Sequence, residues 1–229
     1  MTIKVSALGW VDVVNGIPVV KRPLPSTNYY SGWPNPPHGI MLHYTAGCQP
    51  DIFTTLSSRG ISAHFNVDRE GHIFQYVSLL NRAAHAYDAN HTHFGIEHSA
   101  LPGTCNLTQV QRDNSAKLSA GIREWCAPRG FKIATIHIPG CDLTKSGFKE
   151  HKDGIHCYWN PNGHVDNPGT IWGWDKYLAL VVASAPVQQP AFKIGSRIFY
   201  HLNNALRFFG RQFGDAVPGD AHTIRVVKR

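Results

Sequence analysis

The chain has 229 residues, of which 42% are hydrophobic, and a formal net charge of +7. This length predicts one domain of ordinary size with a short appendage. No run of about eighteen apolar residues is present, which excludes a long transmembrane helix. The segment Met1–Trp10 lacks the basic and apolar parts of an export signal, so we expect a protein made in the cytoplasm without a signal peptide.

The N-terminal segment contains a strong hairpin signal. The sequence Val11–Val20 has two apolar runs around Asn15-Gly16, and both of these turn residues tolerate a positive φ. Residues 21–37 are rich in Pro and Tyr, which is typical of an ordered surface arm. We therefore expect a hairpin and a covering arm over residues 1–38.

The middle of the chain alternates between predicted strands and helices. Apolar runs predict strands at Gly39–His43, Ala63–Asp68, His72–Val77 and Phe94–His98, and the second and third form a hairpin. Thr108 with Gln111 makes a capping box for a helix that Pro128 and Gly130 end. A closing helix is expected at Trp174–Ala183. The predicted fold is therefore α/β (α+β): a central mixed sheet flanked by helices.

Residues 141–174 and the C-terminus lack these regular patterns. The first stretch is rich in Gly, Asn, Pro, His and Trp without a period, and such long irregular stretches often carry function. We expect a catalytic domain at residues 1–184, a linker at 185–196 and a basic tail at 197–229. From residue 185 onward the chain has seven basic and two acidic residues, and apolar residues from Ile198 to Phe209 fit one face of an amphipathic helix. That helix could lie on an anionic surface or dock onto its own domain.

The five cysteines are Cys48, Cys105, Cys126, Cys141 and Cys157, an odd number with no CxxC pair. This pattern argues against a disulfide framework and favours a reducing compartment. We therefore expect all five to be small buried apolar residues.

Fourteen histidines direct attention to metal or acid–base chemistry. His43 follows an apolar strand in HYTAG, His151 lies in GFKEHKDG, and Asp166 lies in GHVDNPG. Zinc binds two imidazoles and a carboxylate and keeps a fourth position for water, whose pKa then falls to about 7. The spacings are long, so by themselves they do not identify a metal site.

Six segments occur in an order that resembles the type-2 N-acetylmuramoyl-L-alanine amidase and peptidoglycan recognition family. They span residues 39 to 180 and are HYTAG, SAHFNVDREGHIFQ, AAHA, GIE, GFKEHKD and HVDNPG with the Trp-rich segment after it. The resemblance implies that His43, His151 and Asp166 are zinc ligands. It also implies that Glu97 of GIE is the acidic group beside the zinc-bound water, acting as general base and then general acid.

The sequence departs from the family pattern at two positions. His164 stands where family enzymes often carry Lys, so the resemblance assigns His164 to stabilising the oxyanion. Ala63 stands where phage lysozyme-like members have Tyr, which places more of the proton transfer on Glu97. Asp166 is present, whereas non-cleaving recognition proteins lack the third ligand, and this favours an enzyme.

The remaining candidates are given structural or secondary roles. We interpret His64 and His85 as structural or substrate-lining, and His72, His91, His93 and His98 as surface or loop residues. The competing ligands, ranked second, are His137, His156, Cys141 and Cys157. Trp159, Trp172 and Trp174 either line a substrate groove or pack under the loop.

The function expected from the resemblance is zinc-dependent hydrolysis of the amide bond between N-acetylmuramic acid and L-alanine in bacterial peptidoglycan. A phage or prophage endolysin that acts on the cell wall after release is favoured, because a tail of charge +5 would be attracted to anionic wall polymers. The alternatives are a cytosolic muropeptide-recycling amidase and a non-catalytic peptidoglycan-binding module. Nucleic acid is not an expected partner, since the net positive charge is concentrated in the tail and no nucleic-acid-binding motif is present.

Overall fold

The computed structural model describes residues 3–151, 153, 171–185, 192–194 and 197–199. The chain divides into two compact units, Met1–Ala185 and Pro186–Arg229. The predicted site residues His164 and Asp166 lie outside the described residues, as do His156, Cys157 and Trp159. Within the described part of the chain, no helix is both long enough and apolar enough to cross a membrane.

The first unit is built around one mixed sheet, in the order β1-β2-β3-β7-β6-β9-β5-β10. The bounds of its strands are β1 Ile3–Val5, β2 Val11–Val14, β3 Ile17–Lys21, β5 Gly39–Leu42, β6 Phe65–Val67, β7 Ile73–Gln75, β9 His93–His98 and β10 Gly147–Glu150. Strands β6, β9, β5 and β10 are mutually parallel neighbours, whereas β1–β2, β2–β3 and β6–β7 pair antiparallel. A separate two-stranded sheet pairs β4 (Tyr29–Tyr30) with β8 (Arg82–Ala83).

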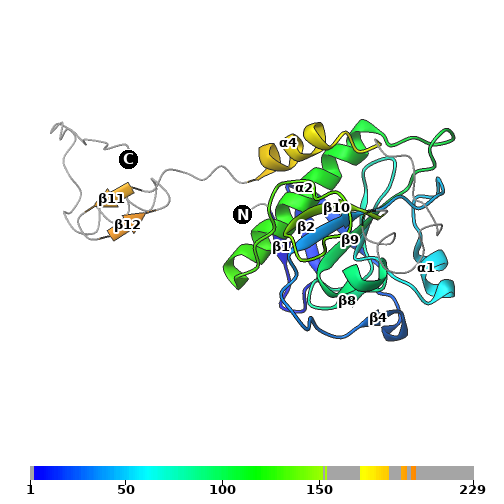
Figure 1. The fold of residues 1–229 in the computed structure, drawn as a ribbon, viewed down its shortest axis with the longest axis horizontal. Helices are drawn as coiled ribbons and strands as arrows, with labels where there is room; N and C mark the ends of the chain where they lie inside the picture. Colours follow the sequence, from blue (N-terminus) through cyan, green and yellow to red (C-terminus); the bar gives the residue numbers. More distant parts are fainter. Residues whose placement is uncertain (1–2, 152, 154–170, 186–191, 195–196, 200–229) are drawn as a thin grey trace. The chain divides into compact units, whose positions relative to one another are not determined.

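Helices α2 (Gln109–Cys126) and α4 (Trp174–Ser184) lie side by side and cover one face of the sheet (Figure 1). The main core lies beneath them and includes Ile40, Leu42, Phe94 and Ile96 from the central strands. Side chains alternate between the two faces of a strand. Met41 of β5 and Gly95 of β9 therefore lie on the face of the sheet away from α2 and α4. Helix α1 (Phe53–Arg59) and the short 3-10 segment η2 (Tyr87–His91) lie outside this helical layer.

Several predicted local structures are confirmed. Asn15 and Gly16 both have positive φ, 46° and 82°, and they join β2 to β3 as the hairpin signal indicated. Thr108 caps α2 in a complete capping box with Gln111. The fold class is also confirmed, a central mixed sheet flanked by helices.

Strand β10 corrects the prediction that residues 141–174 are irregular throughout. Its four residues pair in parallel with β5, in the register Gly147 with Gly39 to Glu150 with Leu42. Lys149 interrupts the apolar pattern that would predict a buried strand, yet its side chain is fully buried. Its ammonium donates to the carbonyl oxygens of Ile138 and Gly140, which compensates for the loss of water.

The cysteine prediction was also wrong. Cys48 and Cys105 form a disulfide, with their Cα atoms 5.9 Å apart, and Cys141 is disulfide-bonded as well. The segments after β5 and β9 continue side by side, because Thr45 and Gly47 donate to the carbonyls of His98 and Ala100. This parallel extension brings together two cysteines that are 57 residues apart. Cys126 is buried and free, as expected of a small apolar residue.

In the second unit, the described residues form a small antiparallel pair, β11 (Phe192–Ile194) with β12 (Arg197–Phe199). The predicted linker therefore contains a strand, and the predicted amphipathic helix does not begin at residue 197. Only Gly195 and Ser196 separate the two strands in the sequence, and a glycine-led pair is typical of a two-residue hairpin connection. The other positions of that helix lie outside the described residues.

Candidate active site

Three neighbouring parallel strands bring the predicted site residues into one row, where β10 and β5 end and β9 is one residue from its end. Glu150 of β10 pairs with Leu42 of β5, and Leu42 pairs with Ile96 of β9. The next residue along each strand is His151, His43 and Glu97, respectively. These are two of the three predicted zinc ligands and the predicted acid–base residue.

The side chains in this row are close together. The Nδ1 atom of His43 lies 3.9 Å from Oε1 of Glu97. The ring centroids of His43 and His151 are 4.5 Å apart, with the ring planes tilted by 52°. Residues 42 and 96 point into the core under α2, so residues 43 and 97 lie on the opposite face of the sheet.

His43 is almost completely buried, with 2% of its surface exposed. Burial lowers its pKa well below the usual value, and the neighbouring His151, His85 and His98 lower it further. The ring is therefore neutral near pH 7, which is the form that can bind a metal ion. Glu97 keeps 16% of its side chain exposed, although its Oε2 atom is buried.

His85 contacts His43 directly, which the sequence did not predict. Its Nδ1 atom lies 2.9 Å from Nε2 of His43, and its Nε2 atom lies 3.1 Å from the carbonyl oxygen of His93. Burial is the largest cause of a pKa well below the usual value for His85. The AAHA segment drew attention to this residue, but no spacing in the sequence shows that it touches His43.

His64 has a structural role. The backbone N–H of Gly95 donates to its Nδ1 atom at 3.0 Å, and its Nε2 atom donates to the carbonyl of Asn81 at 3.0 Å. The ring is fully buried and stacks against Trp33, and burial lowers its pKa to about 4. Both nitrogens are used by the backbone, so His64 is not available as a ligand.

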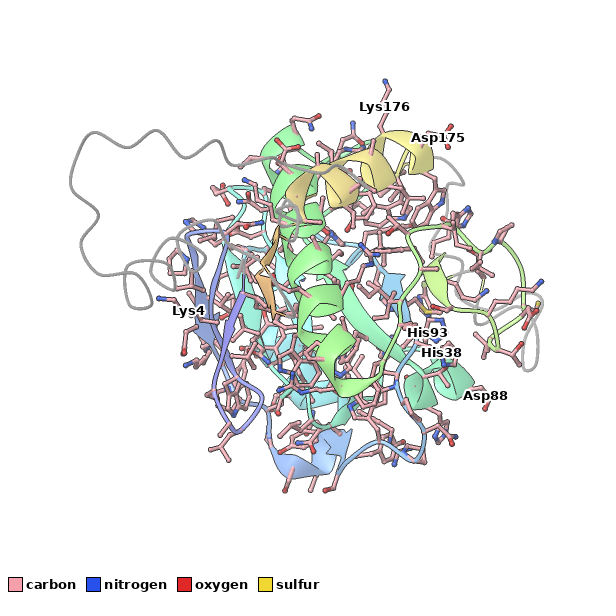
Figure 2. The ribbon with its side chains drawn as sticks, turned by 90° about the vertical axis from the view of Figure 1, so that its left-hand side faces the viewer. Lys4, His38, Asp88, His93, Asp175 and Lys176 are labelled. Carbon is pink, nitrogen blue, oxygen red and sulfur yellow. A yellow bond between two sulfur atoms is a disulfide. The ribbon has the colours of Figure 1, made fainter. Side chains whose placement is uncertain are left out.

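The prediction of surface positions is wrong for His93 and His98, which are fully buried in β9. His98 faces α2, where Nδ1 donates to the carbonyl of His43 at 2.7 Å and Nε2 is 2.7 Å from Oγ of Ser115. His93 faces the other side, where its ring packs edge-on against His38 (Figure 2). His93 and His98 thus lie on opposite faces of β9, and the sheet is covered on both faces at these two positions.

The second-ranked ligand His137 belongs to a different cluster. His137, Glu150 and Asp153 have potential ligand atoms within 4.8 Å of one another. The carboxylate of Asp153 already accepts hydrogen bonds from His137 and from the backbone N–H groups of Gly140 and Glu150. This network explains the cluster as a support for the chain around His151. Cys141 is excluded as a thiolate ligand because its sulfur is in a disulfide.

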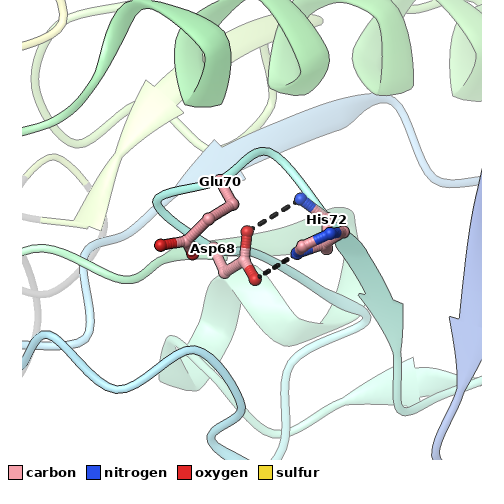
Figure 3. Close-up of side chains that lie close together, drawn as sticks. All are labelled: Asp68, Glu70 and His72. Atoms are coloured by element: carbon pink, nitrogen blue, oxygen red, sulfur yellow. Dashed lines mark hydrogen bonds and ion pairs between the residues drawn. The ribbon is translucent and has the colours of Figure 1, made fainter.

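A third cluster, Asp68, Glu70 and His72, lies in the β6–β7 turn (Figure 3). The two carboxylate oxygens of Asp68 accept from the backbone N–H of His72 at 2.7 Å and from its Nδ1 at 2.8 Å. Glu70 and His72 are exposed. The contacts of Asp68 close the hairpin, which accounts for the cluster without a ligand.

Two of the predicted tryptophans pack inside the fold. Trp172 has 2% of its surface exposed and lies 4.6 Å from His98 between ring centroids, within the core under α2. Trp174 stacks on His137 with centroids 4.1 Å apart. For Trp172 the prediction of a packing role is therefore favoured over the prediction that it lines a substrate groove.

The donor set in the row fits a zinc ion. Zinc prefers imidazole nitrogen and carboxylate oxygen, and the row provides two neighbouring imidazoles with a carboxylate beside them. His43 has the neutral form that coordination requires. A catalytic zinc site uses three protein ligands, and the predicted third ligand, Asp166, lies outside the described residues.

The structure thus combines a mixed sheet flanked by helices with two histidines and a glutamate in one row beside the carboxyl ends of parallel strands. Residues 33–169 match the family described as N-acetylmuramoyl-L-alanine amidase, and the chain belongs to this family. No curated protein sequence matches the chain.

Similar solved structures agree with this fold. N-acetylmuramoyl-L-alanine amidase LysC from Clostridium intestinale URNW is 19% identical with a TM-score of 0.51, covering 70% of this chain and 95% of that one. The Staphylococcus aureus hydrolase AmiA, in complex with its ligand, is 13% identical with a TM-score of 0.52, covering 73% and 86%. At these identities the similarity establishes the fold alone.

Proposed function

We propose that this protein is a zinc-dependent N-acetylmuramoyl-L-alanine amidase that cuts peptidoglycan between the muramic acid lactyl group and L-alanine. The observation that carries the proposal is the row His151, His43 and Glu97 at the ends of β10, β5 and β9. Membership of the amidase family gives the substrate class. His43 and His151 would hold the metal ion with Asp166.

A zinc ion at this position would polarise the scissile carbonyl and supply water that ionises near neutral pH. Glu97 would accept the proton of the attacking water and deliver it to the leaving amine, a role supported by the 3.9 Å between its Oε1 atom and Nδ1 of His43. His164 would donate a hydrogen bond to the oxyanion, and its contribution would depend on its protonation.

The disulfide Cys48–Cys105 favours action outside the cytoplasm. Disulfides persist in oxidising surroundings and are rare in the reducing cytosol. This observation supports a wall-degrading endolysin over a cytosolic recycling enzyme. The net charge of +5 beyond residue 184 supports the same choice, since anionic wall polymers would attract it in a salt-dependent manner.

The proposal is tested by measuring metal content and the release of new L-alanine amino termini from purified sacculi, before and after chelation. We expect about one zinc per chain and release that stops on chelation and returns with zinc, as one three-ligand site requires. Soluble anhydro-muropeptides serve as the second substrate: a clear preference for them over sacculi would favour the recycling enzyme. Binding of sacculi without zinc and without amine release would identify a recognition module and remove the catalytic assignment.

A further inference from the structure

The hydrogen bonds of His85 indicate a role for this residue that differs from metal binding and from the acid–base role of Glu97. A neutral imidazole has one N–H and one lone pair, and which nitrogen carries the hydrogen decides which nitrogen can bind a metal ion. For His43 this choice is decisive, because Nε2 contacts His85 and Nδ1 lies beside Glu97.

The backbone determines the hydrogen positions in this chain of contacts. The Nε2 atom of His85 lies 3.1 Å from the carbonyl oxygen of His93, which can only accept, so Nε2 of His85 carries hydrogen. In the neutral ring, Nδ1 of His85 is then an acceptor. It lies 2.9 Å from Nε2 of His43, so Nε2 of His43 carries hydrogen and donates. The lone pair of His43 is left on Nδ1.

Gly95 makes room for this arrangement. A Cβ atom at residue 95 would lie 2.7 Å from Cγ and 2.8 Å from Nδ1 of His85, which is closer than real Cβ contacts. Glycine therefore lets the His85 ring lie against β9, where its two nitrogens reach His93 and His43. The same glycine donates its N–H to His64, so the strand fixes both rings.

We propose that His85 is a positioning residue that fixes His43 in the Nε2–H tautomer and so directs the Nδ1 lone pair into the metal site. This inference rests on the proposed function, since it concerns a ligand of the proposed zinc ion. Groups that donate or accept behind a metal-binding histidine typically change metal affinity by about 10- to 100-fold when they are removed.

The test compares His85→Phe with His64→Phe as the matched control. His64 lies close to His85, with 6.1 Å between ring centroids, but its hydrogen bonds go to Gly95 and Asn81 and not to His43. Two quantities are measured: the nitrogen chemical shifts of the His43 ring in metal-free protein, and zinc affinity by competition with a chromophoric chelator. Thermal unfolding of each variant shows that the compared proteins are folded.

We expect wild-type His43 to show the Nε2–H tautomer, and His85→Phe to show a mixture and to bind zinc about 10- to 100-fold more weakly. His64→Phe should keep both properties. His85→Asn should recover most of the affinity, because its amide oxygen can accept from Nε2 of His43 in place of Nδ1. If His85→Phe does not fold, the His43 tautomer and the zinc affinity are compared with the wild type in His85→Asn and in Gly95→Ala. The added Cβ atom of Gly95→Ala displaces the His85 ring.

The inference is overturned if His85→Phe retains the tautomer and the zinc affinity of the wild type, or if His64→Phe loses as much affinity. These results would leave the amidase proposal intact as long as the wild type binds zinc and releases L-alanine termini. If the wild type binds no zinc, the proposed function fails, and the ring shifts of metal-free protein still decide whether His85 sets the tautomer.

Discussion

The two faces of the β5–β9 pair use the same residue type in opposite ways. His98 on the helix-covered face and His43 on the other face are both buried, and burial is the main cause of a lowered pKa in each, to about 3 for His98. Yet both ring nitrogens of His98 are used by groups of the fold, the carbonyl of His43 and the hydroxyl of Ser115. In His43, Nε2 contacts the ring of His85 and Nδ1 lies 3.9 Å from Oε1 of Glu97, which are side chains of the proposed site. Burial and pKa therefore do not separate a structural from a functional histidine, whereas the partners of the ring nitrogens do.

The largest effect is expected from Glu97→Gln, on the face of the sheet opposite to α2 and α4. Loss of the carboxylate should lower kcat for release of L-alanine termini by about 100- to 10,000-fold, the range of general acid–base catalysis. Zinc content and the unfolding temperature should stay near those of the wild type, because Glu97 is not one of the proposed ligands. A variant with undiminished kcat would remove Glu97 from the chemistry.

The disulfide Cys48–Cys105 lies beyond the ends of β5 and β9 and joins the segments that follow these two strands. Replacing both cysteines by Ser should lower the free energy of unfolding by about 4 kcal/mol, because a cross-link between residues 57 apart restricts the unfolded chain. Chemical denaturation measures this value. The double variant is preferred to a reducing agent, because a reducing agent would also break the disulfide of Cys141. Activity well below the unfolding temperature should persist, since backbone hydrogen bonds from Thr45 and Gly47 still align the two segments. Unchanged stability would mean that the two thiols are not joined in solution.

On the helix-covered face, His98→Leu should reduce stability and spare the chemistry. The substitution leaves the carbonyl of His43 and the hydroxyl of Ser115 without one partner each, which costs about 2 to 3 kcal/mol in total. Turnover per folded molecule should remain close to that of the wild type. Ser115→Ala is the comparison variant: it removes the contact with Nε2 of His98 and the contact with the Tyr177 hydroxyl, and it should cost about 2 kcal/mol while leaving the carbonyl of His43 paired with Nδ1 of His98. A large loss of kcat without loss of stability in His98→Leu would contradict the division between the two faces.

How much of the fold and of the candidate site could be predicted depends on the distance along the chain over which each sequence pattern acts. The turn at Asn15-Gly16 and the capping box of Thr108 depend on residues within a few positions, and both are confirmed. The row of His151, His43 and Glu97 depends on which strands are parallel neighbours and in which register. Spacing along the chain carries no such information, so only the family resemblance brought these residues together.

The errors have the same physical origin. Cys48 and Cys105 pair because two parallel strands extend side by side, and their distance in the sequence hides this. β10 was not predicted because it contains Lys149, and a lysine is rarely buried unless it is paired. Here the carbonyl oxygens of Ile138 and Gly140 accept from its ammonium. The contact between His85 and His43 likewise depends on the close approach that Gly95 permits.

The smallest effect is expected at the beginning of α2, the helix that covers the other face of the sheet. Thr108→Ala removes the side-chain oxygen that accepts from the backbone N–H of Gln111, and such caps contribute about 1 kcal/mol to stability. Thr108→Ser keeps the oxygen and should retain most of that free energy, which makes it the matched control in denaturant unfolding. Neither variant should change zinc affinity or kcat, because α2 contacts the face of the sheet opposite to His43 and Glu97. If Thr108→Ala lowered zinc affinity while Thr108→Ser did not, the helical layer would be coupled to the metal site, and the two faces could no longer be treated as independent.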